Sequence, residues 1–488
     1  MPKLQASSQS QVMQTANRAS TTKAWAKAIT QPAAEFPLTP LPILSGQVPA
    51  GLRGSLYRNG PGRLERGGAR VGHWFDGDGA ILAVHFADRV TSLYRYVQTT
   101  GYQEEESAGQ FLYGNYGMTA PGPIWNQWLK PLKHTANTSV LALPDKLLAL
   151  WEGDHPYALD LKTLQTWGRD NLGGLNEGVP YSAHPKCDPH TGEIFNFGIS
   201  LGLNATLNVY RSDRTGKILQ KAAIQLEGVP LVHDFVLAGQ YLVFFIPPVR
   251  VNALPLLIGW STYSDAIEWQ PSRGTQLLVV DRETLRVVSR GETEPWYQWH
   301  FANGYMDASG TVVVDVIRYA DFQTNQYLKE VATGQTHTSA KSTLWRVHLN
   351  PTSGKVTAIT EILDKHCEFP VVPQQSVGQA SPHTYLSIQR QVVDSSQELF
   401  GVIARFDHQT NTLTIADMEE NCYPTEPIYV PDPTSANRGW IVTVVYDGNA
   451  DASEVWVFES DRLDEEPLCR LGLPSVIPPS FHGTWKPA

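Results

Sequence analysis

The sequence predicts an all-β protein that folds as a β-propeller of about seven blades. Short apolar runs of strand length, such as residues 147–151 and 442–445, alternate with turn residues along most of the chain. The 39 Gly and 34 Pro among 488 residues supply turns throughout. A signature of strand, polar turn and strand also recurs about every 50 to 70 residues, which fits one outer hairpin per four-stranded blade. A stack of β-sandwiches is the alternative at this point.

The recurring hairpins share one turn chemistry. An Asp or Asn ends the first strand and accepts backbone hydrogen bonds, and a Thr, Gly or Asn follows in the turn. The hairpins begin at Leu159, Tyr210, Val279, Val347 and Arg405. Their even distribution predicts that the propeller fills most of the chain.

The N-terminal segment differs from the rest. Residues 1–20 are polar and rich in Gln and Ser, and we expect a flexible leader before a single domain that spans residues 21–488. Residues 21–30 predict a short helix with Trp25 and Ile29 on one face, ended by Pro32. No apolar stretch resembles a signal peptide or approaches the ~20 residues of a membrane span.

Charge and cysteine usage narrow the partners and the compartment. The formal net charge is −10, without a run of Lys and Arg, which argues against nucleic acid and against a polybasic grip on anionic lipid. The four cysteines, Cys187, Cys367, Cys422 and Cys469, lie far apart, so neither a zinc knuckle nor a disulfide framework is indicated. We therefore expect a cytoplasmic protein.

Two apolar, aromatic segments interrupt the strand pattern, at residues 118–132 and 251–269. Both are too long for hairpin loops, and each carries a stripe at helical spacing. The stripes are Ile124, Trp125, Trp128 and Leu129 in the first segment, and Leu254, Leu257 and Ile258 in the second. Such stripes are usually buried, but on insertions outside a complete propeller they equally fit a substrate entrance or a patch that dips into one membrane leaflet. We expect a cap of helices and loops over one face.

Four of the 14 histidines lie in similar apolar surroundings near predicted strand starts: His184, His233, His300 and His482. Because the inner strands of a propeller converge on its axis, imidazoles that are distant in sequence can meet there. An all-nitrogen ligand set with open positions suits a divalent iron that binds oxygen, while manganese, copper and zinc stay open on chemical grounds. The simpler alternative for His482, near the end of the sequence, is a tail packed on the surface.

Three glutamates in apolar surroundings complete this pattern: Glu152, Glu368 and Glu426. A metal-bound histidine normally passes its other ring proton to a carboxylate, so these residues are candidates to orient the histidines. Salt bridges at the rim of the molecule are the alternative for each.

Several longer motifs are more specific than any of these features. They are LYRNGPG from Leu56, HWFDGDG from His73, ALWEG from Ala149, AHP from Ala183 with Asp188-Pro189, HDF from His233, His300 with Asn303, EFP from Glu368, EPIYVP from Glu426 and FHG from Phe481. With these motifs the chain resembles the carotenoid cleavage oxygenase family from Pro49 onward, and its cyanobacterial carotenoid and apocarotenoid oxygenases in particular. Thr425 departs from the glycine expected before Glu426, and His73 and Asp76 fit a structural turn.

The resemblance implies a seven-bladed propeller with Fe(II) on its axis. It implies His184, His233, His300 and His482 as ligands, Glu152, Glu368 and Glu426 as carboxylates behind three of them, and Thr138 as the residue whose methyl group restricts an open coordination position. Candidates for an aromatic substrate tunnel, as motif neighbours of the ligands, are Phe75, Trp151, Phe235, Trp299, Phe301 and Phe369. The family also implies an apolar patch that binds one membrane leaflet.

The implied activity is a dioxygenase that cleaves a conjugated C=C bond of a carotenoid or apocarotenoid with O2, with aldehydes, retinal among them, as products. A stilbene-cleaving enzyme of the same fold and a non-catalytic carotenoid-binding propeller are the alternatives. The sequence leaves the position of the cleaved bond and the oligomeric state open.

Overall fold

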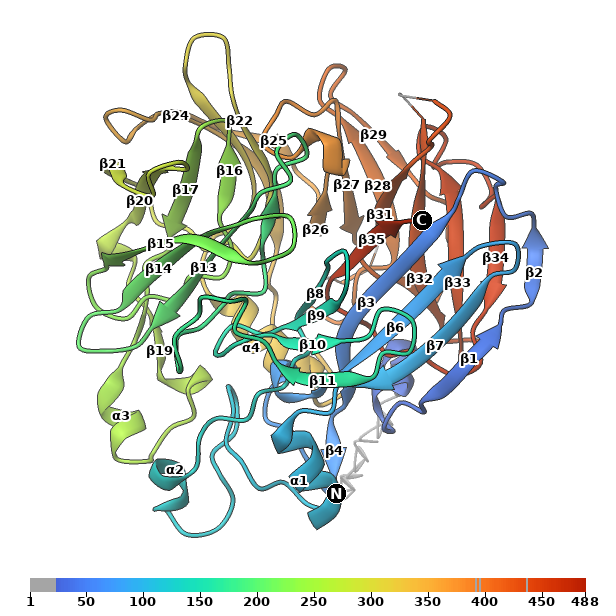
Figure 1. Ribbon diagram of the computed structural model, residues 1–488, viewed down its shortest axis with the longest axis horizontal. Coiled ribbons are helices and arrows are strands. Elements are labelled where there is room, and N and C mark those ends of the chain that lie inside the picture. The colour runs from blue at the N-terminus through green and yellow to red at the C-terminus, as the bar shows by residue number, and fades with distance from the viewer. Residues whose placement is uncertain (1–22, 391–392, 395, 436–437) are drawn as a thin grey trace, which may run out of the picture.

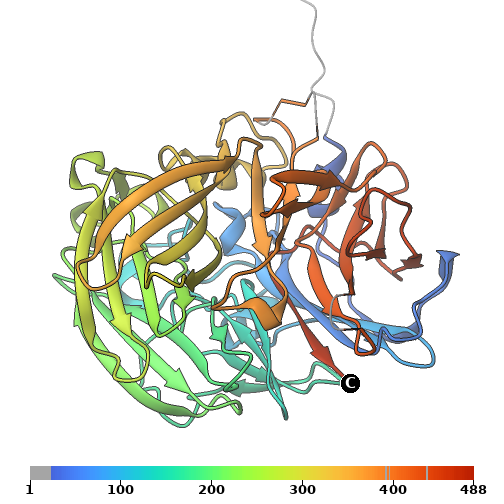
Figure 2. The ribbon, with the colours of Figure 1, turned by 90° about the horizontal axis from the view of Figure 1, so that it is seen from above.

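The computed structural model describes residues 23–488 apart from residues 391–392, 395 and 436–437 and the side chain of Leu257. Within this part of the chain the strands form seven large sheets arranged as a ring, which confirms the predicted seven-bladed propeller (Figures 1 and 2). The flexible leader expected at residues 1–20 lies outside the described residues. The helix expected at residues 21–30 is a 3₁₀ helix at Ala24–Ile29, with Trp25 and Ile29 buried.

The second to sixth blades follow the chain in order, and each begins with its innermost strand. The second blade contains β8 (Ser139–Ala142), β9 (Leu147–Leu150), β10 (Tyr157–Leu159) and β11 (Thr166–Arg169), and the third contains β12 (Lys186–Cys187), β13 (Ile194–Ser200), β14 (Thr206–Ser212) and β15 (Ile218–Gln225). The fourth blade contains β16 (Val236–Ala238), β17 (Tyr241–Ile246), β20 (Thr275–Asp281) and β21 (Val287–Thr293), and the fifth contains β22 (Phe301–Met306), β23 (Val312–Tyr319), β24 (Ser342–Asn350) and β25 (Lys355–Leu363). The sixth blade contains β26 (Cys367–Val371), β27 (His383–Ile388), β28 (Val402–Asp407) and β29 (Thr412–Ile415).

The first and seventh blades join the two ends of the chain. The first contains β1 (Phe36–Pro40), β3 (Gly54–Arg63), β6 (Asp78–Phe86), β7 (Thr91–Tyr96) and β35 (Gly483–Pro487), and the seventh contains β2 (Ile43–Gly46), β30 (Cys422–Pro424), β31 (Ile428–Pro431), β32 (Gly439–Asp447), β33 (Ala452–Glu459) and β34 (Cys469–Gly472). The C-terminal strand β35 pairs with β3, and the N-terminal strand β2 pairs with β34. The ring is therefore closed at two places, because the C-terminal strand completes the first blade and the N-terminal strand completes the seventh. Two small hairpins, β4 (Glu65–Arg66) with β5 (Ala69–Arg70) and β18 (Val249–Val251) with β19 (Ile267–Trp269), lie outside the blades.

The five recurring hairpins of the sequence join the third and fourth strands of five successive blades. Each turn is fixed as predicted. For example, Asp160 accepts hydrogen bonds from the N–H groups of Lys162 and Thr163, and Asp407 accepts from those of Gln409 and Thr410. The hydrophobic core lies between neighbouring blades.

The helices and long loops gather around one end of the ring. They include α1 (Thr100–Ala108), α2 (Asn126–Leu129), α3 (Ala253–Leu257) and α4 (Gln323–Val331), with short 3₁₀ helices at Trp74–Asp76, Ser264–Ala266 and Pro271–Arg273. Another 3₁₀ helix, Gln374–Ser376, follows β26 and lies near the turn between β16 and β17. The two predicted insertions carry α2 and α3, which project together at the lower edge of Figure 1. The Ser264 N–H in the second insertion donates to the carbonyl oxygen of Tyr116, two residues before the first insertion, at 2.7 Å.

Most of the apolar stripes on these insertions face outward rather than into a core. The exposed fractions are 55% for Trp125, 54% for Trp128, 77% for Leu129, 66% for Leu254 and 83% for Trp260. The side chain of Leu257 lies outside the described set. No helix in the described part of the chain is long and apolar enough to cross a membrane.

Candidate metal centre

One residue from the start of the innermost strand of each blade lies around the axis at the same end of the ring. His184, His233 and His300 precede β12, β16 and β22, and His482 precedes β35. Thr138 precedes β8, Glu368 lies in β26, and Glu426 lies between β30 and β31. The propeller therefore turns seven sequence positions, spread from residue 138 to residue 482, into one circle.

The four predicted histidines meet on the axis. One ring nitrogen from each lies within 4.8 Å of those of the other three, and all four residues are buried. The ring centroid of His184 is 4.4 Å from that of His233 and 4.8 Å from that of His482, and the His300 centroid is 4.7 Å from that of His482. His482 is thus part of the cluster, and the alternative of a tail packed on the surface is wrong.

The three predicted glutamates each contact the Nδ1 atom of one histidine. Glu368 Oε2 lies 2.5 Å from His300 Nδ1, Glu426 Oε1 lies 2.9 Å from His482 Nδ1, and Glu152 pairs with His233 Nδ1. The Gly483 N–H donates to the other oxygen of Glu426 at 2.9 Å, which fixes that carboxylate despite Thr425 before it. Because the carboxylates hold Nδ1, they leave Nε2 of three rings to face the cluster.

The surroundings favour neutral imidazoles at His184 and His482 and ionised carboxylates at Glu368 and Glu426. Burial and the three neighbouring rings hold the pKa of His184 well below its ordinary value. Burial also lowers the pKa of His482 against the opposing effect of Glu426. Burial would lower the pKa of His300, but Glu368 more than offsets this and raises it. Burial alone would raise the pKa of Glu368 and of Glu426, but the adjacent His300 and His482 outweigh this effect and lower both pKa values.

The donor set fits a metal ion. Among the described residues, the buried Nε2 atoms of His184 and His300 have no hydrogen-bond partner. Buried polar atoms are nearly always satisfied, and converging imidazole lone pairs repel unless a cation lies between them. Four nitrogen donors without a thiolate or a carboxylate ligand can bind a divalent transition metal, and imidazole alone does not select among iron, manganese, copper and zinc.

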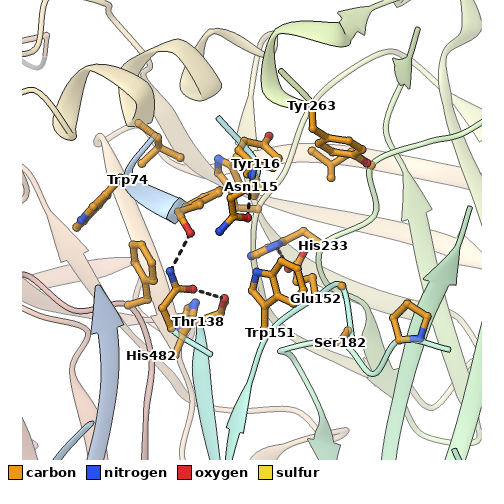
Figure 3. Close-up of a pocket in the computed structure, with 18 of the residues that line it drawn as sticks. Trp74, Asn115, Tyr116, Thr138, Trp151, Glu152, Ser182, His233, Tyr263 and His482 are labelled. Atoms are coloured by element: carbon orange, nitrogen blue, oxygen red, sulfur yellow. Dashed lines mark hydrogen bonds and ion pairs between the residues drawn. The ribbon is translucent and has the colours of Figure 1, made fainter. Parts of the chain in front are cut away.

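A cavity of about 900 Å³ runs past the cluster. Figure 3 shows Thr138 and His482 on one side of it, with Trp151, Glu152 and His233 facing them. Of the predicted tunnel residues, Phe75, Trp151, Trp299 and Phe369 line this cavity.

The other two predicted tunnel residues lie elsewhere. Phe235 is buried between the third and fourth blades against Phe197 and Phe244, and Phe301 packs between the fourth and fifth blades against Phe245. The structure therefore corrects their placement. Phe301 follows His300 by one residue at the start of β22, where successive side chains point to opposite faces. Phe235 follows His233 by two residues in the irregular segment before β16, where strand alternation does not apply. Closeness in sequence to a ligand therefore does not place a ring in the cavity.

Comparisons with known proteins agree with this geometry. Residues 29–487 match the family described as "Retinal pigment epithelial membrane protein". The chain belongs to this family. It is 31% identical to the apocarotenoid-15,15'-oxygenase of a Synechocystis species, over 91% of this chain and 92% of that protein. It is 26% identical to resveratrol cleavage oxygenase 1 of Aspergillus fumigatus, over 90% of this chain and 91% of that protein. The solved structure of cobalt-substituted Synechocystis ACO superposes with a TM-score of 0.85 at 29% identity, covering 95% of this chain and 98% of that one.

In this family member, sequence reasoning missed the residues that connect the ligands. Asp234 follows His233 directly and accepts a hydrogen bond from the N–H of Phe301, the residue after His300, at 3.0 Å. Its other carboxylate oxygen forms an ion pair at 2.7 Å with Lys186, which lies two residues after His184. One buried carboxylate thus joins the inner strands of three blades. The HDF motif contained this signal, because a buried Asp beside a ligand needs partners.

Arg58 was also missed, although it lies in the LYRNGPG motif. Its buried guanidinium donates to the Glu426 carbonyl oxygen, the Ser480 hydroxyl and the Phe481 carbonyl oxygen, each at 2.9 Å. Gly60 lets this segment approach, since an added Cβ would lie 2.6 Å from the Cα of Ser480. Arg58 therefore fixes the segment that carries His482.

Two further features of the cavity wall were not visible in the motifs. Tyr116, just before the first insertion, and Tyr263, in the second, line the cavity and lie 5.6 Å apart between ring centroids. Phe369 adopts a φ of 51°, which is costly for an aromatic residue. Its N–H donates to Glu368 Oε2 at 2.6 Å, so the strained backbone serves the carboxylate that holds His300.

Proposed function

We propose that the protein is a non-haem Fe(II) dioxygenase that cleaves a conjugated C=C bond of a carotenoid or apocarotenoid with O2. Both oxygen atoms enter the products, so one C=C bond and one O2 give two carbonyl groups. The observation that carries the proposal is the cluster of four buried imidazoles, three of which line a mainly apolar cavity that also carries many aromatic side chains. A relative named for apocarotenoid cleavage covers nearly the whole chain. Cleavage of an apocarotenal at its central bond would yield retinal.

His184, His233, His300 and His482 would hold the iron, which when bound supplies the redox chemistry that activates O2. Glu152, Glu368 and Glu426 keep three of these rings in one orientation through Nδ1. One solved relative is a cobalt-substituted form, and a metal in that protein supports a metal at the equivalent position here.

The remaining wall residues position the polyene. Phe75, Trp299 and Phe369 present aromatic faces, which bind a conjugated chain and stabilise positive charge that develops along it. Thr138 lies at the cavity wall, where its methyl group would restrict the open side of the metal. Its hydroxyl donates to Asn137 Oδ1 at 3.1 Å, which turns the methyl away from that partner. No side-chain acid or base is needed, because the reaction transfers no proton from the chain.

The exposed apolar surface on α2 and α3 suits an entrance from one membrane leaflet. Leu132 belongs to both features, since it lines the cavity and is 53% exposed beside the patch. A polyene that is poorly soluble in water could thus pass from lipid into the cavity without crossing solvent. A phenolic stilbene would not need such a surface, so the patch favours the carotenoid.

The test is incubation of the iron-loaded protein with a panel of carotenoids, apocarotenals and stilbenes, with the fragments identified by mass. We expect two carbonyl fragments from a polyene and about one iron per chain. His300→Ala should abolish both iron binding and cleavage, whereas His383→Ala, outside the cluster, should leave both unchanged. Full cleavage by iron-free protein would refute the proposal. Fragments from stilbenes only would establish the stilbene alternative, and bound but uncleaved pigment would establish a carrier.

A further inference from the structure

The end of the cavity behind Phe369 carries two polar groups that the proposed chemistry does not use. The ring centroid of Phe369 lies 5.5 Å from that of His300 and 6.5 Å from that of Phe400, and the Phe400 centroid lies 4.9 Å from that of His366. All four of these residues line the cavity. The rings therefore mark a path from the candidate metal centre to His366.

His366 and Ser387 lie on one face of the sixth blade. Ser387 in β27 is paired with Glu368 in β26, and residues directly opposite in an antiparallel pair share a face. His366 precedes Glu368 by two residues, which places it on that face as well. Both His366 and Ser387 line the cavity.

The shortest hydrogen bond of His366 indicates which ring nitrogen carries the proton. The N–H of Ser342 can only donate, and it points at His366 Nδ1 at 3.1 Å, so Nδ1 is the acceptor. The contacts from Nδ1 to the Ser342 hydroxyl oxygen, at 3.2 Å, and to the Ser342 carbonyl oxygen, at 3.4 Å, are longer and would need a proton on the same atom. Burial lowers the pKa of His366 to about 4, so the ring is neutral near pH 7. The proton therefore lies on Nε2, which has no hydrogen-bond partner among the described residues.

Ser387 is also unsatisfied. Its side chain is buried, and its hydroxyl has no hydrogen-bond partner within the described residues. The two tyrosine hydroxyls nearby are already used, because those of Tyr327 and Tyr423 donate to Glu398 at 3.0 and 2.9 Å. Buried hydroxyl and N–H groups without partners are rare in folded proteins, so this end of the cavity has hydrogen-bonding capacity for a ligand.

We propose that His366 and Ser387 form a subsite for a substrate oxygen atom, with His366 Nε2–H donating to it. The inference rests on the proposed function and adds a substrate class: a polyene whose leading end carries a carbonyl or hydroxyl group. A polyene with only hydrocarbon ends would leave both groups unpaired in an apolar wall, which disfavours it. The oxygen could be a terminal aldehyde or a ring hydroxyl, since both accept a hydrogen bond.

The test is a binding titration of the iron-loaded full chain, kept free of O2 so that no cleavage occurs, with tryptophan fluorescence as the signal. Three probes of equal polyene length are compared: an apocarotenal with a ring hydroxyl, the same apocarotenal without it, and the hydrocarbon with a methyl group in place of the aldehyde. His366→Phe keeps an aromatic ring and removes the donor. We expect it to raise Kd about tenfold for oxygenated probes and to leave the Kd of the hydrocarbon unchanged.

The probes separate the two sources of oxygen. A loss confined to the hydroxylated probe assigns the subsite to the ring hydroxyl, and an equal loss for both aldehydes assigns it to the aldehyde. Ser387→Ala, which removes a single oxygen, should weaken the same probe in the same direction. Equal Kd values for wild type and both variants, or an equal loss for all three probes, would overturn the subsite. Cleavage assays of the wild type with O2 test the proposed function separately, because binding preference does not depend on turnover.

Discussion

Replacing Arg58 by Met tests whether the segment that carries His482 is held from β3. The change removes three hydrogen bonds of 2.9 Å and leaves Glu426 buried without the guanidinium, 3.7 Å away, that balances it. Although burial lowers the pKa of Arg58 to about 10, the group is still charged near pH 7. Removing one partner of a buried ion pair lowers the free energy of unfolding by about 3–5 kcal/mol. Because methionine fills much of the volume that arginine leaves, this loss of stability reports the polar contacts rather than a cavity.

Urea unfolding and metal content are the two measurements. We expect the free energy of unfolding to fall by about 3–5 kcal/mol and metal affinity to fall about 10- to 100-fold, because Glu426 then no longer orients His482. Arg53→Met is the matched control. Arg53 pairs with Asp88 at 2.9 Å, but both side chains are largely exposed, so its loss should cost less than about 1 kcal/mol and leave the metal in place. If Arg58→Met behaved like Arg53→Met, the segment would be held by its backbone hydrogen bonds to Asn59 and Thr138 rather than by the Arg58 side chain.

Three further changes test other parts of the structure. Asp234→Asn removes the charge that joins Lys186 and the Phe301 N–H across three inner strands. The metal affinity of this variant, measured by competition with a chelator, should fall about tenfold. Trp260→Ser removes an exposed apolar side chain next to α3 and should reduce sedimentation of the protein with neutral lipid vesicles about tenfold. The control is Trp167→Ser, which removes an exposed tryptophan from β11 and should leave sedimentation unchanged. An equal loss in both variants would show that the apolar surface on α2 and α3 has no special role in lipid binding. Partial burial of Glu330 is outweighed by hydrogen bonds from Thr338, Gln326 and the N–H of His337, which lower its pKa to about 2. This carboxylate therefore stabilises the fold above pH 4.5, and the contribution is lost as pH falls toward 2; Glu330→Gln should flatten thermal stability across that range.

The blade pattern could be predicted because it is local. An Asp such as Asp160 fixes its own turn through the next three residues, so a hairpin can be recognised without knowledge of its neighbours. The candidate metal site was found by composition and family resemblance rather than by local rules. Only the ring geometry explains why His184 and His482 meet, since nothing near either residue encodes the other.

What the sequence could not supply is the direction of individual side chains and the identity of long-range partners. Phe235 and Phe301 are close to ligands in sequence, yet both side chains are buried in cores between blades. Arg58 and Asp234 act through backbone groups of residues far away in the chain, and a backbone carbonyl or N–H leaves no mark in the sequence. Such contacts become visible only when the strands are placed.

The double closure of the ring has a consequence for the order of events during synthesis. His184, His233 and His300 are complete long before the residues of β35 leave the ribosome, and domains begin to fold from the N-terminal side as they emerge. Until residue 482 is available, a growing chain can offer at most three of the four imidazoles, and its first blade lacks its innermost strand. The complete set of four imidazoles therefore forms only after the C-terminal strand has closed the ring.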